Sequence, residues 1–342
     1  MKKIDVNNSW EMHRVGDDDW ITATVPGSVY GDLLQAGKME DPFWKDNEIE
    51  SLKLMDYDYE YRTSFSCDDE LLESDEVILR FEGLDTIADI TLNGVKLGHA
   101  DNMHRTWEYS VKDTLKQTDN ILSVYFYSPT KFIADAFAKA PTRGTEDAMN
   151  GFVHIRKAHC MFGWDWGPQT IDAGIFRDIY LQGYSHARIE DIRIHQQHAK
   201  NVSVQTSITL SESVPGQKLC VELSEDGADK PLQTKLCKTN ADGVAAVDFV
   251  IENPKLWWPN DYGDQPLYIV RTTLLDEDGT SLESITRRIG LRTLTISQEK
   301  DEWGNEFAFC VNGVKIFTRG GNYIPDCLLY TSPSPRDSTS SR

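Results

Sequence analysis

The sequence predicts a mainly β protein in which two antiparallel β-sandwiches follow one another and the beginning of a barrel comes after them. From residue 57 onward, apolar and polar residues alternate in short runs, as they do in half-buried antiparallel strands. The pairs Asn93-Gly94 and Asn312-Gly313 lie between such runs, and Asn-Gly is a strong signal for a type I′ hairpin turn. One clear helical pattern, over about 129–140, interrupts the strands.

We expect residues 1–184 to form the first sandwich, with loops gathered at its ends. Its first 60 residues are polar and rich in aromatic side chains, and we interpret them as loops around one short helix over 28–36. The helix over 129–140 begins with a proline and ends before Pro141. The predicted strands read YDYEYRTSF, EVILRFEG, ADITLNGVKLG, WEYSV, NILSVYFYSP and GIFRDIYLQGY.

Residues 185–292 are expected to form an immunoglobulin-like sandwich, because strand-like runs follow one another there at short, regular spacing. The runs are ARIEDIRIHQQ, VSVQTSITL, KLCVELSED, GVAAVDFVIEN, PLYIVRTTLLDEDG and SITRRIGLR. His195 and His198 have no further ligands nearby, so we interpret them as solvated residues at a strand end and not as metal ligands.

Residues 293–326 are predicted to begin a barrel. The hairpin at Asn312-Gly313 is followed by a strand that runs into Gly320-Gly321, and such a turn is how a barrel strand places residues at an active-site rim. Residues 327–342 are rich in Ser, Pro, Thr and Arg and show no periodicity. We therefore expect this tail to be non-native or disordered, and the abrupt change predicts that the barrel is truncated there.

Composition and charge exclude several classes of partner. The chain has 342 residues, of which 39% are hydrophobic, and a net charge of −20, which is unfavourable for binding nucleic acid. No run is long enough to span a membrane, and the first residues lack the apolar stretch of a signal peptide. The 6 cysteines have no metal-ligand spacing. We expect a cytoplasmic protein without a metal or other cofactor, and the sequence leaves its oligomeric state open.

The stretch His154–Pro168, HIRKAHCMFGWDWGP, fits neither a strand nor a helix pattern. Glycines and a proline flank Trp164, Asp165 and Trp166, which predicts a turn or loop. Exposed indoles beside a carboxylate suit a sugar, because sugar C–H faces pack on indole and sugar hydroxyls donate to carboxylate oxygens. The alternative is a tryptophan corner that caps the sandwich core while Asp165 holds its own turn. Residue types alone slightly favour this second interpretation.

Four stretches resemble the β-mannosidases of glycoside hydrolase family 2. They are NMHRTWEY (102–109), IRKAHCMFGWDWGP (155–168), NPKLWWPNDYGDQPLY (253–268) and VNGVKIFTRGGNYIP (311–325). The third is general to the family, whereas FGWDWGP is specific to the mannosidase branch and its close relatives. The resemblance runs from about residue 8 to 325. It implies a sugar-binding-like (jelly-roll) β-sandwich, an immunoglobulin-like β-sandwich and the first strand of a truncated (β/α)8 TIM barrel.

The resemblance also implies a reaction. Members of the family release terminal non-reducing β-D-mannose with retention, using a pair of glutamates held roughly 5–5.5 Å apart. Both glutamates belong to barrel strands beyond residue 325, so no catalytic residue is assigned and the fragment itself is predicted to be inactive. Glu299, Glu302 and Glu306 lie in a polar run before the hairpin, and we expect them to be solvated.

For the substrate, the resemblance implies that the Trp-Asp-Trp stretch reaches the barrel mouth and helps to form the pocket for terminal mannose. Asp165 then accepts hydrogen bonds from mannose hydroxyls, and Trp164 and Trp166 form the walls. Asn322 is a candidate for the pocket rim, and Tyr323 replaces the tryptophan that the family usually has there. The resemblance thus favours the sugar-binding interpretation, with a mannose-containing oligosaccharide as the partner.

Two alternatives remain. One is a non-catalytic carbohydrate-binding protein made of the two sandwiches, and the other is a different glycosidase of the same family, of the β-galactosidase or β-glucuronidase type. The single barrel strand counts against the first, because a self-contained binding module would not keep it. The FGWDWGP stretch counts against the second.

Overall fold

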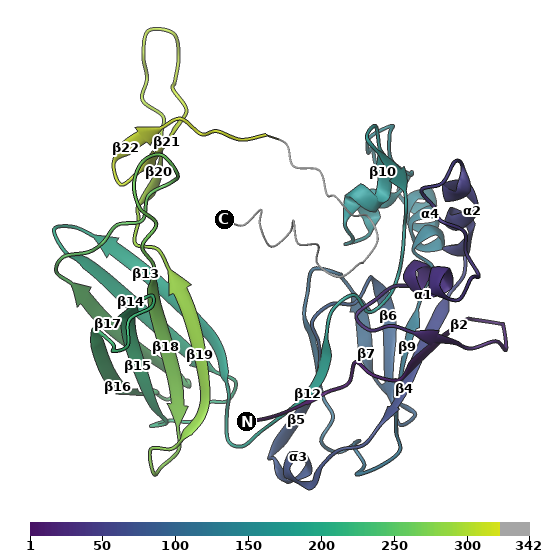
Figure 1. Ribbon diagram of the computed structural model, residues 1–342, viewed down its shortest axis with the longest axis horizontal. Coiled ribbons are helices and arrows are strands. Elements are labelled where there is room, and N and C mark those ends of the chain that lie inside the picture. Colours follow the sequence, from purple (N-terminus) through teal and green to yellow (C-terminus); the bar gives the residue numbers. More distant parts are fainter. Residues whose placement is uncertain (322–342) are drawn as a thin grey trace. The chain divides into compact units, whose positions relative to one another are not determined.

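The computed structural model describes residues 1–321 and is mainly β, as the sequence predicts (Figure 1). The chain divides into two compact units, Lys2–Tyr184 and a second unit that begins at Ser185, and each is described here by itself. Within the described residues, no helix has the length and apolar character that crossing a membrane requires. The predicted rim residue Asn322 and the predicted tail, 327–342, lie outside the described residues.

The first unit is a sandwich of two antiparallel sheets (Figure 1). The larger sheet has the strand order β3-β2-β4-β9-β6-β7, and the smaller has the order β1-β12-β5-β8. Their bounds are β1 (Lys2–Asp5), β2 (Trp10–Arg14), β3 (Ile21–Ala23), β4 (Tyr59–Phe65), β5 (Glu76–Phe81), β6 (Ile87–Leu92), β7 (Val95–Asp101), β8 (Trp107–Ser110), β9 (Asn120–Phe126) and β12 (Ile179–Tyr184).

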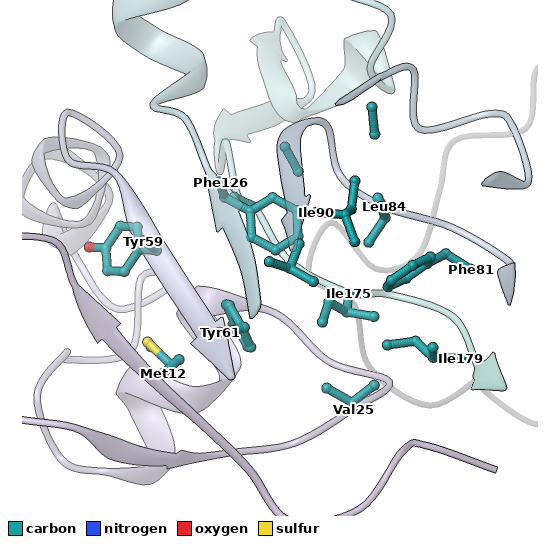
Figure 2. Close-up of a cluster of buried hydrophobic side chains, with 14 of the residues drawn as sticks. Met12, Val25, Tyr59, Tyr61, Phe81, Leu84, Ile90, Phe126, Ile175 and Ile179 are labelled. Carbon is teal, nitrogen blue, oxygen red and sulfur yellow. The ribbon is translucent and has the colours of Figure 1, made fainter. Parts of the chain in front are cut away.

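Alternating side chains fill the space between the two sheets, and Figure 2 shows this cluster of buried residues. In β4, Tyr59 and Tyr61 point into the core while Arg62 faces solvent, which is the period of two expected of a half-buried strand. The ring of Tyr61 meets the ring of Phe126 edge to face at a centroid distance of 5.7 Å. Full burial of an apolar side chain such as Phe126 contributes about 1.5–3 kcal/mol to folding.

Both predicted helices of this unit are present. They are α1 (Val29–Gln35) and α4 (Pro129–Lys139), and each begins after a serine that caps it. The hydroxyl of Ser28 accepts a hydrogen bond from the Gly31 N–H at 3.3 Å, and that of Ser128 accepts one from the Lys131 N–H at 3.1 Å.

The interpretation of the first 60 residues as loops around one helix is wrong. They also contain β1, β2, β3 and the helix α2 (Asn47–Leu54), and another short helix, α3 (Asp69–Glu73), follows β4. The early strands are only three to five residues long, which is too short for a recognisable alternation. Trp10 belongs to the core, and its indole N–H donates to the Val6 carbonyl at 2.8 Å.

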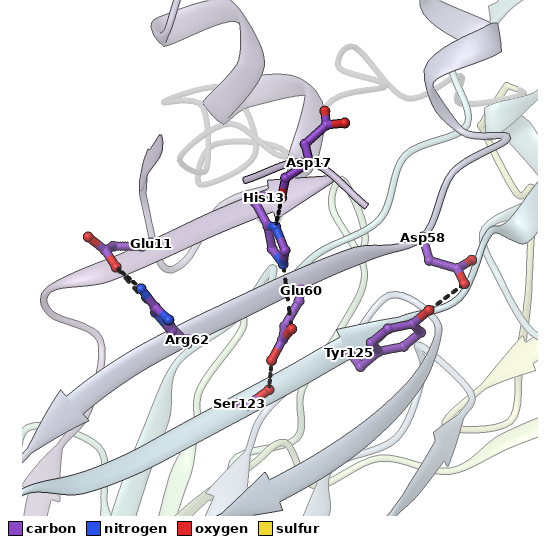
Figure 3. A network of polar contacts seen from close by, with 8 residues as sticks. All are labelled: Glu11, His13, Asp17, Asp58, Glu60, Arg62, Ser123 and Tyr125. Atoms are coloured by element: carbon purple, nitrogen blue, oxygen red, sulfur yellow. Dashed lines mark hydrogen bonds and ion pairs between the residues drawn. The ribbon is translucent and has the colours of Figure 1, made fainter. Parts of the chain in front are cut away.

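Polar pairs cover the outer face of the larger sheet and link β2, β4 and β9 (Figure 3). Glu11 and Arg62 are cross-strand partners, and their side chains approach to 3.2 Å. The imidazole of His13 lies between the Asp17 carbonyl, at 2.7 Å, and the Glu60 carboxylate, at 3.5 Å. These partly exposed contacts specify which strands pair, and each contributes little to stability.

The second unit contains the predicted immunoglobulin-like sandwich. One sheet has the order β13-β14-β17 and the other has the order β16-β15-β18-β19. The strands are β13 (Ile189–His198), β14 (Val202–Leu210), β15 (Lys218–Glu225), β16 (Gln233–Lys238), β17 (Val244–Ile251), β18 (Tyr268–Leu275) and β19 (Ser281–Ile289). The sequence did not predict β16, because this edge strand is exposed over most of its length and has no apolar alternation.

A three-stranded sheet of β20 (Leu294–Ser297), β21 (Ala308–Val311) and β22 (Val314–Ile316) follows. Asn312 and Gly313 in its hairpin have φ angles of 50° and 80°, and Asn93 and Gly94 between β6 and β7 have 51° and 82°. Positive φ at both central residues is what a type I′ turn requires, so both predicted turns are confirmed. The strand expected to run into Gly320 ends earlier, at Ile316, because residues 317–321 have no strand partner in the described part of the chain.

Candidate functional site: a tryptophan-rich hairpin

The stretch that fitted neither a helix nor a strand is a small β-hairpin. It consists of β10 (Phe162–Trp164) and β11 (Gly167–Gln169), and Asp165 and Trp166 form the two-residue turn between them. Phe162 pairs with Gln169, and Trp164 pairs with Gly167. The sequence pattern missed these strands because each is three residues long.

The base of the hairpin is fixed to the core of the first unit. Phe162 is fully buried, and its ring lies 6.2 Å from that of Phe152. The Met149 N–H donates to the Phe162 carbonyl at 3.0 Å. Gly163 has a φ of +96°, and a Cβ there would lie 2.7 Å from Cγ of Gln169, so only glycine fits. The strands of the hairpin therefore start from a defined position.

The tip of the hairpin is exposed. Trp164 and Trp166 keep 42% and 38% of their surface accessible, and Asp165 is exposed as well. Within residues 1–321, the Asp165 carboxylate accepts no hydrogen bond and forms no ion pair. A tryptophan corner would bury its indoles and use Asp165 to hold the turn, and neither is seen. The tip thus presents two aromatic faces and one unpaired acceptor group to solvent.

A buried ion pair anchors both ends of the segment that contains the hairpin, residues 158–171. Lys157 precedes the hairpin, is almost fully buried and pairs with the buried carboxylate of Asp85. Its ammonium also donates to the carbonyl of Asp172, which follows the hairpin, at 2.8 Å. One side chain therefore ties the start of segment 158–171 to its end.

Two buried aspartates, Asp172 at the end of this segment and Asp32, have raised pKa values. Burial raises the pKa of Asp172 to about 7, although hydrogen bonds from Ser28 and from the Ala173 and Tyr30 N–H groups oppose the shift. Burial likewise raises the pKa of Asp32 to about 6, against the hydrogen bonds from the Thr24 N–H and the Tyr61 hydroxyl. Both groups support the fold from within and do not reach solvent.

Sequence reasoning did not find this buried network. The signal available was a charged residue inside an otherwise apolar run, as in Thr170-Ile171-Asp172-Ala173. A charge in such a run is almost never buried without a partner. The hydrogen-bond partners Ser28 and Tyr30 are distant from Asp172 in sequence, so the pattern alone did not identify them.

Two open cavities lie beside the segments that lead to the hairpin. A cleft of about 790 Å³ is lined by Asn102, His104 and residues 153–159. A second cavity, of about 660 Å³, is lined by Phe137, residues 141–147 and Asn150.

The second unit contains His198, Glu299 and Glu306, which the sequence analysis considered, and Trp257, which belongs to the stretch 253–268. His198 contacts the side-chain oxygen of Gln196 at 3.0 Å, and burial lowers its pKa. Trp257 packs against Gly290, where an added Cβ would lie 2.9 Å from the indole. Glu299 and Glu306 both face the ammonium of Lys315, at 3.5 and 2.6 Å.

Two family models match the chain. The first, described as glycosyl hydrolase 2 galactose-binding domain-like, matches residues 10–177. The second, glycosyl hydrolases family 2, matches residues 187–292.

Curated relatives include enzymes named β-mannosidase B. That of Aspergillus terreus is 33% identical over 319 residues, which cover 90% of this chain and 36% of the relative. That of Aspergillus fumigatus is 31% identical and covers 96% of this chain and 40% of its own length. The chain thus spans less than half the length of these relatives.

Solved structures of glycosidases are also similar to this chain. The β-D-mannosidase from Dictyoglomus thermophilum has a TM-score of 0.91 and 33% identity, covering 99% of this chain and 42% of that protein. The exo-chitosanase from Amycolatopsis orientalis has a TM-score of 0.69 and 20% identity, covering 97% of this chain and 38% of that one. At 20% identity, the second likeness shows the fold alone.

Proposed function

Because this chain belongs to glycosyl hydrolase family 2, we propose that it provides the sugar-recognition part of an exo-acting β-mannosidase. The intact enzyme releases terminal, non-reducing β-D-mannose from mannose-containing oligosaccharides. It does so with retention, through two glutamates on barrel strands that lie beyond residue 325.

The observation that carries the proposal is the exposed tip of the β10–β11 hairpin. Large aromatic side chains are normally buried, and here two indoles flank a carboxylate in solvent on a base that the core holds in place. A ligand with apolar C–H faces and several hydroxyl donors satisfies both kinds of group at once, and a pyranose has both.

Each residue of the tip has a defined role in this proposal. The Asp165 carboxylate accepts hydrogen bonds from mannose hydroxyls, and such charge-assisted bonds contribute about 1.5–3 kcal/mol each. Trp164 and Trp166 pack against the ring and exclude water from these bonds. The three residues therefore position the terminal sugar, so that the two catalytic carboxyl groups can flank its anomeric carbon.

The glutamates near the end of the described region do not suit the catalytic roles. Glu306 accepts hydrogen bonds from Lys315 and Ser297, and the Lys315 hydrogen bond in particular lowers its pKa. A general acid in a retaining glycosidase needs the opposite shift. Glu299 shares the same lysine, and Glu302 is exposed to solvent. We therefore assign no catalytic residue within residues 1–321.

We also propose that the protein is cytoplasmic. The cysteines of the described region (Cys67, Cys160, Cys220, Cys237 and Cys310) are free thiols, as is usual in a reducing compartment. Localisation of the tagged full-length protein by cell fractionation tests this part of the proposal.

Activity measurements on the full-length protein that contains this chain test the main proposal. The substrates are 4-nitrophenyl glycosides of β-mannose, β-galactose, β-glucuronic acid and β-glucosamine. We expect the β-mannoside to have the highest kcat/KM and the released mannose to keep the β configuration initially. A preference for another sugar would contradict the mannosidase assignment, and binding without turnover would favour a carbohydrate-binding protein.

A further inference from the structure

We propose that the cavity formed by residues 141–150 is a second carbohydrate subsite, which binds the saccharide on the leaving-group side of the bond to be cleaved. This inference rests on the proposed β-mannosidase function and adds a place for the rest of the oligosaccharide. The cavity has a volume of about 660 Å³, which is large enough for one or two sugar rings.

The cavity loop, defined as residues 141–150, is attached to the base of the hairpin. The Met149 N–H donates to the Phe162 carbonyl at 3.0 Å, and the Asp147 carbonyl lies 3.1 Å from where a Cβ of Gly163 would be. At Gly144, a Cβ would lie 2.6 Å from the ring of Phe152, which in turn packs against Phe162. The same buried side chains therefore hold the cavity loop and the hairpin in place.

The polar groups of the cavity are available to a ligand. In the described part of the chain, the side chains of Arg143, Glu146 and Asn150 make no hydrogen bond or ion pair. Thr145 and Asp147 are partly engaged with each other, at 3.3 Å. Phe137, at the end of α4, adds a half-buried aromatic side chain to the lining.

The mixture of these groups identifies the chemical class of the ligand. Arg143 carries one positive charge, while Glu146 and Asp147 carry two negative charges, so the lining does not suit an anion. A neutral polyol fits better, because each hydroxyl both donates and accepts and can satisfy the guanidinium, the carboxylates and the amide together. An apolar wall beside such groups is what a pyranose ring requires. A buried protein interface is less suitable, because its centre would have to desolvate three unpaired charges.

Kinetics of the full-length protein with two substrates test the subsite. β-D-Mannosyl fluoride has a leaving group that fills no further subsite, whereas β-1,4-mannotriose has a disaccharide leaving group. For the double variant Glu146→Ala/Asn150→Ala, we expect kcat/KM on mannotriose to fall about tenfold or more, mainly through KM, because two sugar contacts are lost. Turnover of the fluoride should stay unchanged. The matched control is Glu73→Ala, an exposed glutamate on α3 at the opposite end of the first unit (Figure 1).

The possible outcomes separate this inference from the proposed function. If the unmodified protein hydrolyses neither substrate, both proposals fail. If it hydrolyses both and the double variant is unaffected, the subsite is refuted while the mannosidase assignment stands. An equal loss on both substrates, or a lowered melting temperature, would mean that the loop acts through packing, and this also refutes the subsite. Only a selective loss on mannotriose supports it.

Discussion

Asp165 lies in segment 158–171 and Asp172 directly follows it, yet the surroundings of the two side chains are opposite. Asp165 is exposed at the hairpin tip and has no partner in the described region, whereas Asp172 is fully buried and accepts two backbone hydrogen bonds. In our proposal the first binds a ligand, whereas the second holds the fold. The sequence alone distinguished them only in part, because the environment of Asp172 depends on residues such as Tyr30 that are far away in the chain.

Asp165→Asn should lower activity without lowering stability. The amide keeps the shape of the side chain but loses its charge and turns one acceptor into a donor that faces a sugar hydroxyl. We expect kcat/KM on β-mannosides to fall by roughly one to three orders of magnitude in the full-length protein, each order being about 1.4 kcal/mol. A large drop in melting temperature with intact kcat/KM would show instead that Asp165 holds the turn.

Asp172→Asn should change how stability depends on pH. An unfolded aspartate titrates near 3.8, and the buried Asp172 titrates at about 7. Between these values the unfolded chain releases a proton that the folded chain keeps, so rising pH favours unfolding until the folded pKa is passed. The uncharged variant lacks this loss, so from pH 5 to pH 8 it should gain about 3 kcal/mol of stability relative to the original protein. Urea unfolding of both proteins at pH 5 and at pH 8 measures the difference in their free energies of unfolding. The same difference at both pH values would contradict a raised pKa of Asp172.

At the scale of elements, the hairpin depends on the buried pair of Lys157 and Asp85. Replacing Lys157 by Met leaves the Asp85 carboxylate buried without its ammonium, which typically costs about 3–5 kcal/mol. The matched control is Lys96→Met, because Lys96 pairs with Asp89 at 2.6 Å on the surface and should cost less than about 1 kcal/mol. Chemical unfolding of both variants tests the comparison. Similar losses in the two would show that the buried pair contributes no more than a surface pair.

The accuracy of the sequence predictions also varied from element to element. Strands with a long alternation, such as β4, β6 and β14, were identified, and so were both Asn-Gly turns, because local chemistry specifies them. The short strands β1 and β2 were missed, since their pairing partners and not their own residues make them strands. The hairpin β10–β11 was missed as a secondary structure for the same reason, although its residues were recognised as a candidate site.

At the scale of the whole molecule, we propose that the chain takes part in recognising the sugar and does not hydrolyse it. The chain 1–342 alone should therefore not cleave 4-nitrophenyl β-mannoside above the rate of a mock purification, because a retaining mechanism needs a general acid and a nucleophile on either side of the anomeric carbon. The full-length protein is the positive control. Turnover by the purified chain that Glu306→Gln abolishes would show that the acid lies within it after all.

The bond from Lys157 to the Asp172 carbonyl has a consequence for how this protein can diverge. Both ends of segment 158–171 are fastened to the sandwich, while the three residues at its tip are exposed. We therefore expect substitutions at the tip to carry little folding cost. If the tip binds the sugar as we propose, its preferred sugar can change at two or three positions while the scaffold stays unaltered.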